Sequence, residues 1–150
     1  MASRRSTVVL SALLLAGPAC DDSSSPSPIG PTPAVASVVI AGLTATGQPL
    51  TTTSQPGFVY RLIYVLRETG GRIGVTPVRQ RFELSDGYTT EGNFSGTTRV
   101  PPGGSAPIVS SLSIYPRSVA ASHVTFTITY TDDNGVEGTA TASAAITPVD

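Results

Sequence analysis

From residue 35 onward, apolar and polar side chains alternate in short runs, and no stretch of useful length shows the 3.6-residue period of an amphipathic helix. The runs are rich in Val, Ile, Thr, Tyr and Phe, and clusters of Gly, Pro, Asn and Asp separate them. This pattern predicts an all-β domain. We expect about seven strands, near residues 37–44, 58–67, 72–84, 92–100, 108–115, 123–131 and 136–147.

The last two runs give the strongest signal. Val124, Phe126, Ile128 and Tyr130 alternate with threonines, which predicts one buried face and one face covered by hydroxyl groups. The sequence DDNG at 132–135 then predicts a tight turn into an antiparallel partner strand. The returning run places alanines on the same face, so small side chains lie opposite large ones.

A second hairpin is predicted between 58–67 and 72–84, because Gly70 and Gly71 permit the positive φ of a tight turn. Within 72–84 the apolar positions switch from odd to even numbers around Pro77, which predicts a β-bulge there. The connections rich in Gly, Pro, Thr and Ser, at 44–57 and 101–107, are expected at the ends of the domain.

The run 58–67 is apolar on both faces. We expect its even-numbered face to be buried, because the odd-numbered face carries Arg61 and Arg67, which are costly to bury unpaired. Val59, Ile63 and Val65 would then form an exposed apolar stripe. The alternative buries the odd face and leaves Tyr60 and Tyr64 on the surface, as an aromatic platform of the type that stacks on sugars.

Residues 1–19 are typical of a signal peptide, because Arg4 and Arg5 precede a short apolar segment, 8–16, and small residues follow it. A helix over 8–16 would rise only about 14 Å, roughly half the thickness of the hydrocarbon core. The segment therefore predicts export rather than a membrane-spanning anchor. Residues 20–34 are rich in Ser and Pro, which predicts a disordered, extended tether ahead of the 35–150 domain.

The sequence LLLAGPAC, followed by DDSSSPSPIGPTP, resembles the start of bacterial lipoproteins. The resemblance implies cleavage before Cys20, lipidation of Cys20, and a protein anchored by lipid to a membrane of the cell envelope, in a leaflet that the sequence leaves open. Gly17 stands where that family usually has Leu, Val or Ile. Because Gly17 and Ala19 also fit ordinary signal cleavage, the alternative is a secreted, soluble protein.

The strand pattern of 35–150 resembles the Ig-like or fibronectin-type β-sandwiches of bacterial envelope proteins. The resemblance implies a single Ig-like antiparallel sandwich that serves as a non-catalytic binding or structural module. One alternative is an accessory domain that binds a carbohydrate or another polymer. Another is a subunit that assembles through a free sheet edge. The expected partners are the membrane, through the lipid, and an unknown protein or polysaccharide.

Composition argues against several other classes. Nine Arg and no Lys stand against ten acidic residues, so we expect no nucleic-acid partner. A single Cys and a single His exclude an internal disulfide and a Cys/His metal cluster. His123 lacks the sequence context of a hydrolase, and the acidic segment 132–137 fits a hairpin turn better than a calcium loop. We therefore expect no catalysis, no metal and no cofactor.

Overall fold

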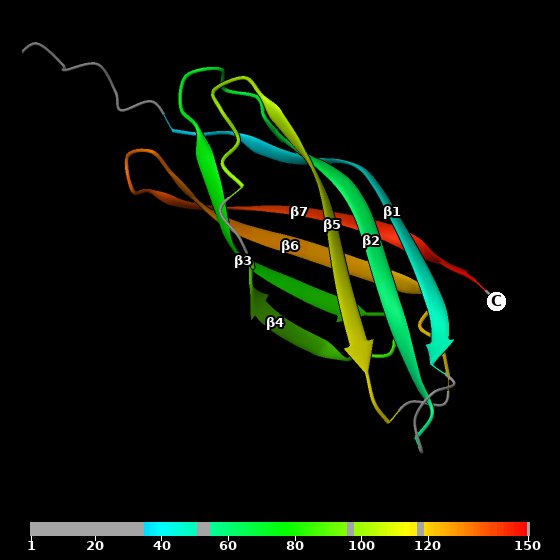
Figure 1. Cartoon of the computed structure of the whole chain (residues 1–150). Coiled ribbons are helices and arrows are strands. Elements are labelled where there is room, and N and C mark those ends of the chain that lie inside the picture. Colours follow the sequence, from blue (N-terminus) through cyan, green and yellow to red (C-terminus); the bar gives the residue numbers. More distant parts are fainter. Residues whose placement is uncertain (1–34, 51–54, 96–97, 117–118, 150) are drawn as a thin grey trace, which may run out of the picture. The chain divides into compact units, whose positions relative to one another are not determined.

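The computed structural model describes residues 35–50, 55–95, 98–116 and 119–149. The predicted signal peptide, Cys20 and the tether lie outside these ranges. Every regular element within them is a strand, which confirms the prediction of an all-β domain. The seven strands are β1 (Val38–Leu50), β2 (Gly57–Glu68), β3 (Val75–Leu84), β4 (Thr89–Asn93), β5 (Ser105–Ile114), β6 (His123–Asp132) and β7 (Glu137–Pro148) (Figure 1).

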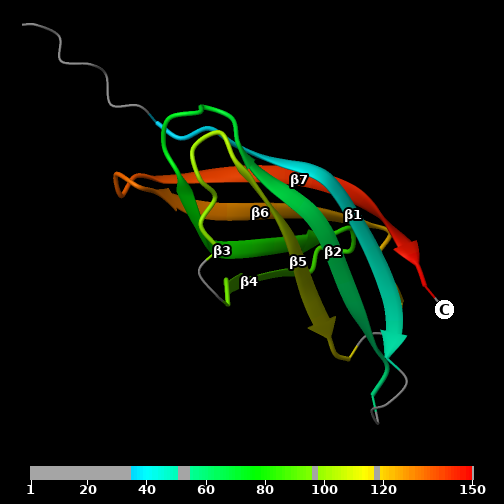
Figure 2. The same cartoon turned by 45° about the horizontal axis from the view of Figure 1, so that its top comes forward.

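The strands form one curled, mixed sheet in the order β4-β3-β6-β7-β1-β2-β5. All neighbours are antiparallel except β1 and β7, which pair in parallel between Ala45 and Gly47 of β1. Most of β7 pairs with β6, and only its last residues pair with β1. The strand β7 therefore joins two walls, β4-β3-β6-β7 and β1-β2-β5, and leaves β4 and β5 as the two sheet edges (Figures 1 and 2).

The core lies inside the curl, where the buried faces of the two walls meet. In β6, and in β2 from Tyr60 onward, the even-numbered side chains are buried, as the alternation predicts. The ring of Phe126 in β6 lies 5.1 Å from the ring of Tyr64 in β2 and 4.9 Å from that of Phe82 in β3. These contacts between rings hold the walls together, and the prediction that 58–67 buries its even face is confirmed.

Two local predictions are confirmed. The turn 132–135 joins β6 and β7 as a hairpin, and Gly135 has a φ of +81°. The bulge predicted near Pro77 is present, because the register between β3 and β6 shifts between Pro77 and Arg79. The pattern that predicts each feature lies within a few consecutive residues, although the bulge itself forms against the distant strand β6.

Other predictions are wrong. The runs 58–67 and 72–84 do not form a hairpin: β2 pairs with β1 and β5, and β3 pairs with β4 and β6. The strand expected at 92–100 ends at Asn93, because Phe94 packs against the core and donates its N–H to the carbonyl oxygen of Val78. The connection expected from residue 44 begins only after Leu50, because a register shift at Gly42 lets β1 resume its pairing with β2.

A buried carboxylate explains why β2 and β3 separate. Glu68, at the end of β2, is only 1% exposed. Its Oε2 accepts hydrogen bonds from the N–H groups of Gly71 (2.8 Å) and Gly103 (2.6 Å), and its Oε1 accepts from Gly70 (2.7 Å) and Ser37 (3.4 Å). Gly71 and Gly103 have φ values of +72° and +64°, a region that favours glycine. Glu68 thus holds the chain in a loop that passes to the other wall instead of folding back as a hairpin.

The same contacts set the acidity of Glu68. Burial by itself raises the pKa of a carboxyl group, but the hydrogen bonds from Gly103, Gly71, Gly70 and Ser37 together outweigh it, so the pKa of Glu68 is lowered. Because the pKa is lower in the folded state, the stabilisation is present above the ordinary carboxyl pKa. It is lost as the pH falls through the folded-state value.

We expect Glu68→Gln to lower the free energy of unfolding by about 2–4 kcal/mol at neutral pH, because the amide presents an NH₂ group to backbone donors and carries no charge. The variant should also lose less stability than the parent between about pH 5 and about pH 2. Urea unfolding across this range measures both effects. Glu83→Gln, which removes an exposed carboxylate, is the control. A parental midpoint and a parental acid dependence in Glu68→Gln would contradict the role of this carboxylate.

Candidate functional site

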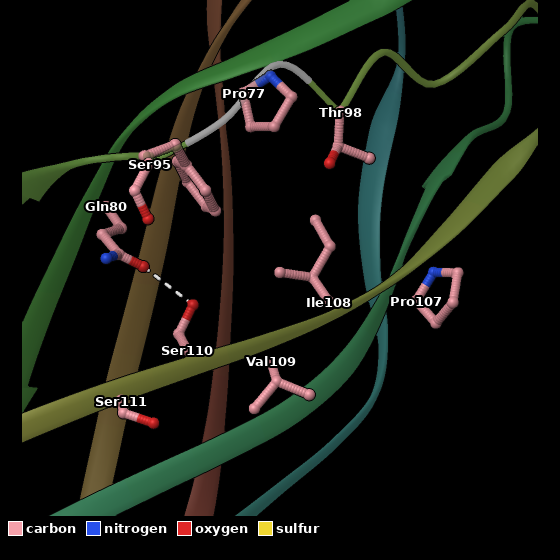
Figure 3. A pocket seen from close by; sticks show the side chains of 10 residues that line it. Pro77, Gln80, Ser95, Thr98, Pro107, Ile108, Val109, Ser110 and Ser111 are labelled. Carbon is pink, nitrogen blue, oxygen red and sulfur yellow. Dashed lines mark hydrogen bonds between the residues drawn. The ribbon is translucent and has the colours of Figure 1, made fainter.

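A groove of about 490 Å³ lies where the curled sheet remains open, between β3 and β5 (Figure 3). Its lining comes from β3, from the segment that follows β4, and from the edge strand β5. The described lining residues are Pro77, Gln80, Phe94, Ser95, Thr98, Pro107, Ile108, Val109, Ser110 and Ser111. The groove exists because β4 pairs with β3 only from Arg79 to Glu83, so the two edges of the sheet do not close on each other.

A chain of hydrogen bonds runs from the core to this groove. Ser110, which is 5% exposed, donates to Oε1 of Gln80 at 2.8 Å, and this bond crosses from β5 to β3 (Figure 3). The hydroxyl groups of Tyr64 and Ser110 are 3.2 Å apart. Because the single proton of Ser110 is used toward Gln80, Tyr64 donates to Ser110. The amide NH₂ of Gln80 has no hydrogen-bond partner in the part of the chain that the structure describes.

The chemistry of the groove is neutral. Burial raises the pKa of Tyr64 to about 12, and the hydrogen bond with Ser110 lowers it only in part. The polar groups at the base of the groove are therefore uncharged near neutral pH, and apolar side chains from Pro77, Phe94 and Ile108 surround them. The described lining residues include no carboxylate, imidazole, amine or thiol. The arrangement can recognise an uncharged ligand through amide and hydroxyl hydrogen bonds and apolar contact.

The structure corrects one predicted site. Tyr60 and Tyr64 are 0% and 1% exposed, so the alternative in which they form a surface platform is wrong. The reason is the one weighed from sequence: burying the even face of β2 leaves Arg61 and Arg67 in solvent. The hydroxyl of Tyr60 accepts a hydrogen bond from the N–H of Ala121 at 3.0 Å. Tyr64 still contributes to the groove, but only through Ser110.

Sequence reasoning missed Gln80 and Ser110. Both are polar residues at positions where the strand alternation places side chains toward the core. Gln80 falls on the same face as Phe82, and Ser110 falls between Ile108 and Leu112 on the inward face of β5. A polar residue on a buried face needs a partner. That requirement marks each residue as notable, although it does not say that they contact each other.

The carboxylates of Asp132 and Asp133, in the turn between β6 and β7, make structural contacts with other groups of the protein. Oδ1 of Asp132 accepts from the N–H groups of Asn134 (2.9 Å) and Val136 (2.8 Å). Asp133 pairs with Arg99, and hydrogen bonding from Arg99 lowers the pKa of Asp133. Among the described residues, no three His, Cys, Asp or Glu side chains gather as metal ligands would.

Among the described residues, His123 does not line the groove. His123 is exposed at the first position of β6. Cys20 falls outside the described ranges. Within those ranges, no helix has the length and apolar character needed to cross a membrane.

No protein-family model matches this chain, and no curated protein matches it. Fifteen chains of solved structures are similar to it, and three of them are compared with it below. The X-ray structure of a Northeast Structural Genomics Consortium target is 11% identical, with a TM-score of 0.54 over 74% of this chain and 86% of that chain. A Bordetella pertussis protein described as ApaA is 14% identical, with a TM-score of 0.49 over 75% and 94%.

The third is the alkylpurine DNA glycosylase AlkC of Pseudomonas fluorescens, in a complex with DNA. It is 14% identical, with a TM-score of 0.36 over 71% of this chain and 31% of that chain. The likeness to the first structure shows a shared fold and nothing about activity. The other two similarities are too distant to support an argument.

We expect Tyr64→Phe to lower the free energy of unfolding by about 1 kcal/mol at neutral pH, because it removes one hydrogen bond and keeps the ring. Since the folded-state pKa of Tyr64 is about 12, its hydroxyl stabilises the fold below the ordinary tyrosine pKa, and this contribution is lost as pH rises toward 12. Between about pH 9 and about pH 12, the free energy of unfolding should therefore fall less steeply in the variant than in the parent, and chemical unfolding measures this. Tyr88→Phe, at an exposed tyrosine, is the control for the loss of a phenol hydroxyl.

Proposed function

We propose that this chain is an exported bacterial lipoprotein, anchored through a lipid on Cys20, whose 35–150 domain is a non-catalytic binding module. The anchoring rests on the sequence LLLAGPAC and the Ser/Pro-rich segment after it. The binding role rests on one observation, the neutral groove between β3 and β5, in which the Gln80 amide NH₂ has no hydrogen-bond partner among the described residues. A recognition role also fits the absence of titratable groups among the described lining residues.

We further propose that the domain is a variant of the Ig-like sandwich. Its seven strands are antiparallel except at one short pair, and its two walls pack through Tyr64, Phe126 and Phe82. In this interpretation β7 passes from one wall to the other and makes the sheet continuous. The interpretation places the groove at the open side of the sandwich, opposite the joining strand.

The ligand that best fits the groove is an extended, uncharged protein segment lying along β5. An edge strand presents unpaired backbone N–H and C=O groups, and a peptide can pair with them as an added strand. Pro107 lacks an N–H, so pairing would be favoured over the rest of β5. The exposed large aromatic residues among those described, Tyr88 and Tyr115, do not line the groove, which reduces the support for a polysaccharide ligand.

A second candidate uses the same edge. The strand β5 spans Ser105–Ile114 and pairs only with β2, so a second copy of the chain could pair along its outer side. This assembly role differs from ligand recognition in the complex that forms, which contains only copies of this chain. It would give oligomers whose amount rises with protein concentration.

The anchoring proposal predicts a lipid on Cys20. When the full chain is expressed in a bacterial host, we expect it in the membrane fraction, with the mass of a diacylglyceryl group on its N-terminal peptide. Cys20→Ser should not mature in this way. Cell fractionation and mass spectrometry of the mature N-terminus give the answer. Soluble parent and variant, both cut after Ala19, would contradict anchoring and support secretion.

The binding proposal predicts contact at the rim of the groove. We expect a photo-crosslinking residue at Thr98, an exposed lining residue, to give adducts with another protein in living cells. The same residue at Thr139, an exposed position of β7 that does not line the groove, is the matched control. Adding Gln80→Leu should reduce the yield at Thr98. Adducts at twice the chain mass would favour assembly, and equal yields at both positions would contradict a groove-specific partner.

A further inference from the structure

The outward side of the β1-β2-β5 wall has an apolar centre between two arginines. We call this surface the arginine face and define it by Val39, Arg61, Ile63, Val65, Arg67 and Val109. Strand pairing brings these residues together, because Ile63 lies opposite Val109 and Arg67 lies opposite Val39. Ile63, Val109 and Val39 are 47%, 53% and 42% exposed, so the centre of the face is apolar and open to solvent. Figure 2 shows the three strands side by side.

The charge on this face is unbalanced. None of the outward-facing residues of β1, β2 and β5 is acidic, since the single acidic residue on these strands, Glu68, is buried. Neither Arg61 nor Arg67 has an ion-pair partner within the described ranges. The β4-β3-β6-β7 wall behaves differently, because Arg79 pairs with Glu137 at 2.7 Å and Arg81 pairs with Glu83. Unpaired positive charge on these two walls is therefore confined to the arginine face.

The spacing of the two arginines matters for the partner. They are six positions apart on one strand, so their backbones are about 20 Å apart, with Ile63 and Val65 between them. A shallow depression of about 330 Å³ lies around Arg61 and Ile63. A hydrated polyanion would favour contiguous cations. Separated cations with an apolar centre instead suit a surface that offers phosphate groups and an apolar layer together.

We propose that the arginine face rests on an anionic lipid surface, with Arg61 and Arg67 at lipid phosphates and Ile63 and Val109 in the interfacial layer. The proposal extends the anchoring through Cys20 and rests on it for the local concentration of lipid. The described chain starts at Val35, and four residues span at most about 14 Å to Val39, which pairs with Arg67. A tether that ends at Val35 would therefore bring this end of the face toward the membrane.

The test compares two charge-matched double variants. All proteins begin at residue 20 and carry Cys20→Ser, so neither a lipid nor the predicted signal peptide contributes to binding. Each arginine near an anionic surface strengthens binding about fivefold, so Arg61→Gln with Arg67→Gln should lower the partition coefficient onto phosphatidylglycerol-containing vesicles roughly 25-fold. Arg79→Gln with Arg81→Gln removes the same charge from the other wall and should change it less than about twofold. Vesicles of phosphatidylcholine alone should bind all the proteins weakly.

A second measurement identifies the face in contact. Since Cys20 is the one cysteine of the chain, a polarity-sensitive dye can be attached after Val109→Cys or after Thr139→Cys in the Cys20→Ser background. With anionic vesicles we expect a blue shift of the dye emission at 109 and none at 139. Ile63→Ser should reduce the shift at 109 without altering the thermal midpoint by more than about 2 °C, because the side chain is half exposed.

Equal binding by the two double variants, or equal dye responses at the two positions, would overturn the proposal. The proposal would also be overturned if the protein sediments as a larger species without vesicles and only the variant with Arg61→Gln and Arg67→Gln does not. The face would then join two copies of the chain. If the vesicle tests fail but Cys20 carries a lipid, the role of the arginine face in lipid binding is wrong and the anchoring proposal still stands. A blue shift at 109, together with a parent chain that acquires no lipid on Cys20 in the host, would contradict the anchoring proposal and leave the affinity of the arginine face for anionic lipid.

Discussion

The hydrogen bonds to the buried carboxylate of Glu68 fix the register of β2, and the rest of the domain follows from that register. A carboxylate is the one kind of group in this strand that can accept from several backbone N–H groups at once. A shift by one residue would bring Arg67, which can only donate, against those N–H groups. It would also turn all the side chains of β2 to the opposite face of the sheet. The contacts at one end of β2 therefore determine which side chains along its length are buried.

Each of the two proposed binding surfaces is connected to one face of this strand. The inward face brings Tyr64 to Phe126 in the core and to Ser110 at the base of the groove. The outward face carries Arg61, Ile63 and Arg67. The surfaces meet at β5, because Val109 lines the groove and also belongs to the arginine face. A lipid surface against Val109 would cover one rim of the groove and leave ligands to approach from the side of Thr98.

The parts of the fold that the sequence predicted depend on contacts within or between adjacent strands. The alternation in β6, the turn at 132–135 and the bulge at Pro77 are each visible in a few consecutive residues. The hairpin expected at Gly70 and Gly71 failed because their N–H groups bind Glu68, whose other donors, Gly103 and Ser37, are more than thirty positions away. The pair of Gln80 and Ser110 was missed for the same reason. Each residue is conspicuous alone, but only the meeting of two walls brings them to 2.8 Å.

The charge of the chain shows why composition could not reveal the arginine face. A net charge of −1 suggests a surface without strong attraction to any partner. In the fold, Arg79, Arg81 and Arg99 are neutralised by acidic neighbours on β3, β4, β7 and the 132–135 turn. Among the described residues, those pairings leave Arg61, Arg67 and Arg72 without an ion-pair partner, and the first two lie on one face of the same strand. Their separation by an even number of residues places both on one side of β2, so the alternation that buries Tyr64 also directs both charges toward the same external surface.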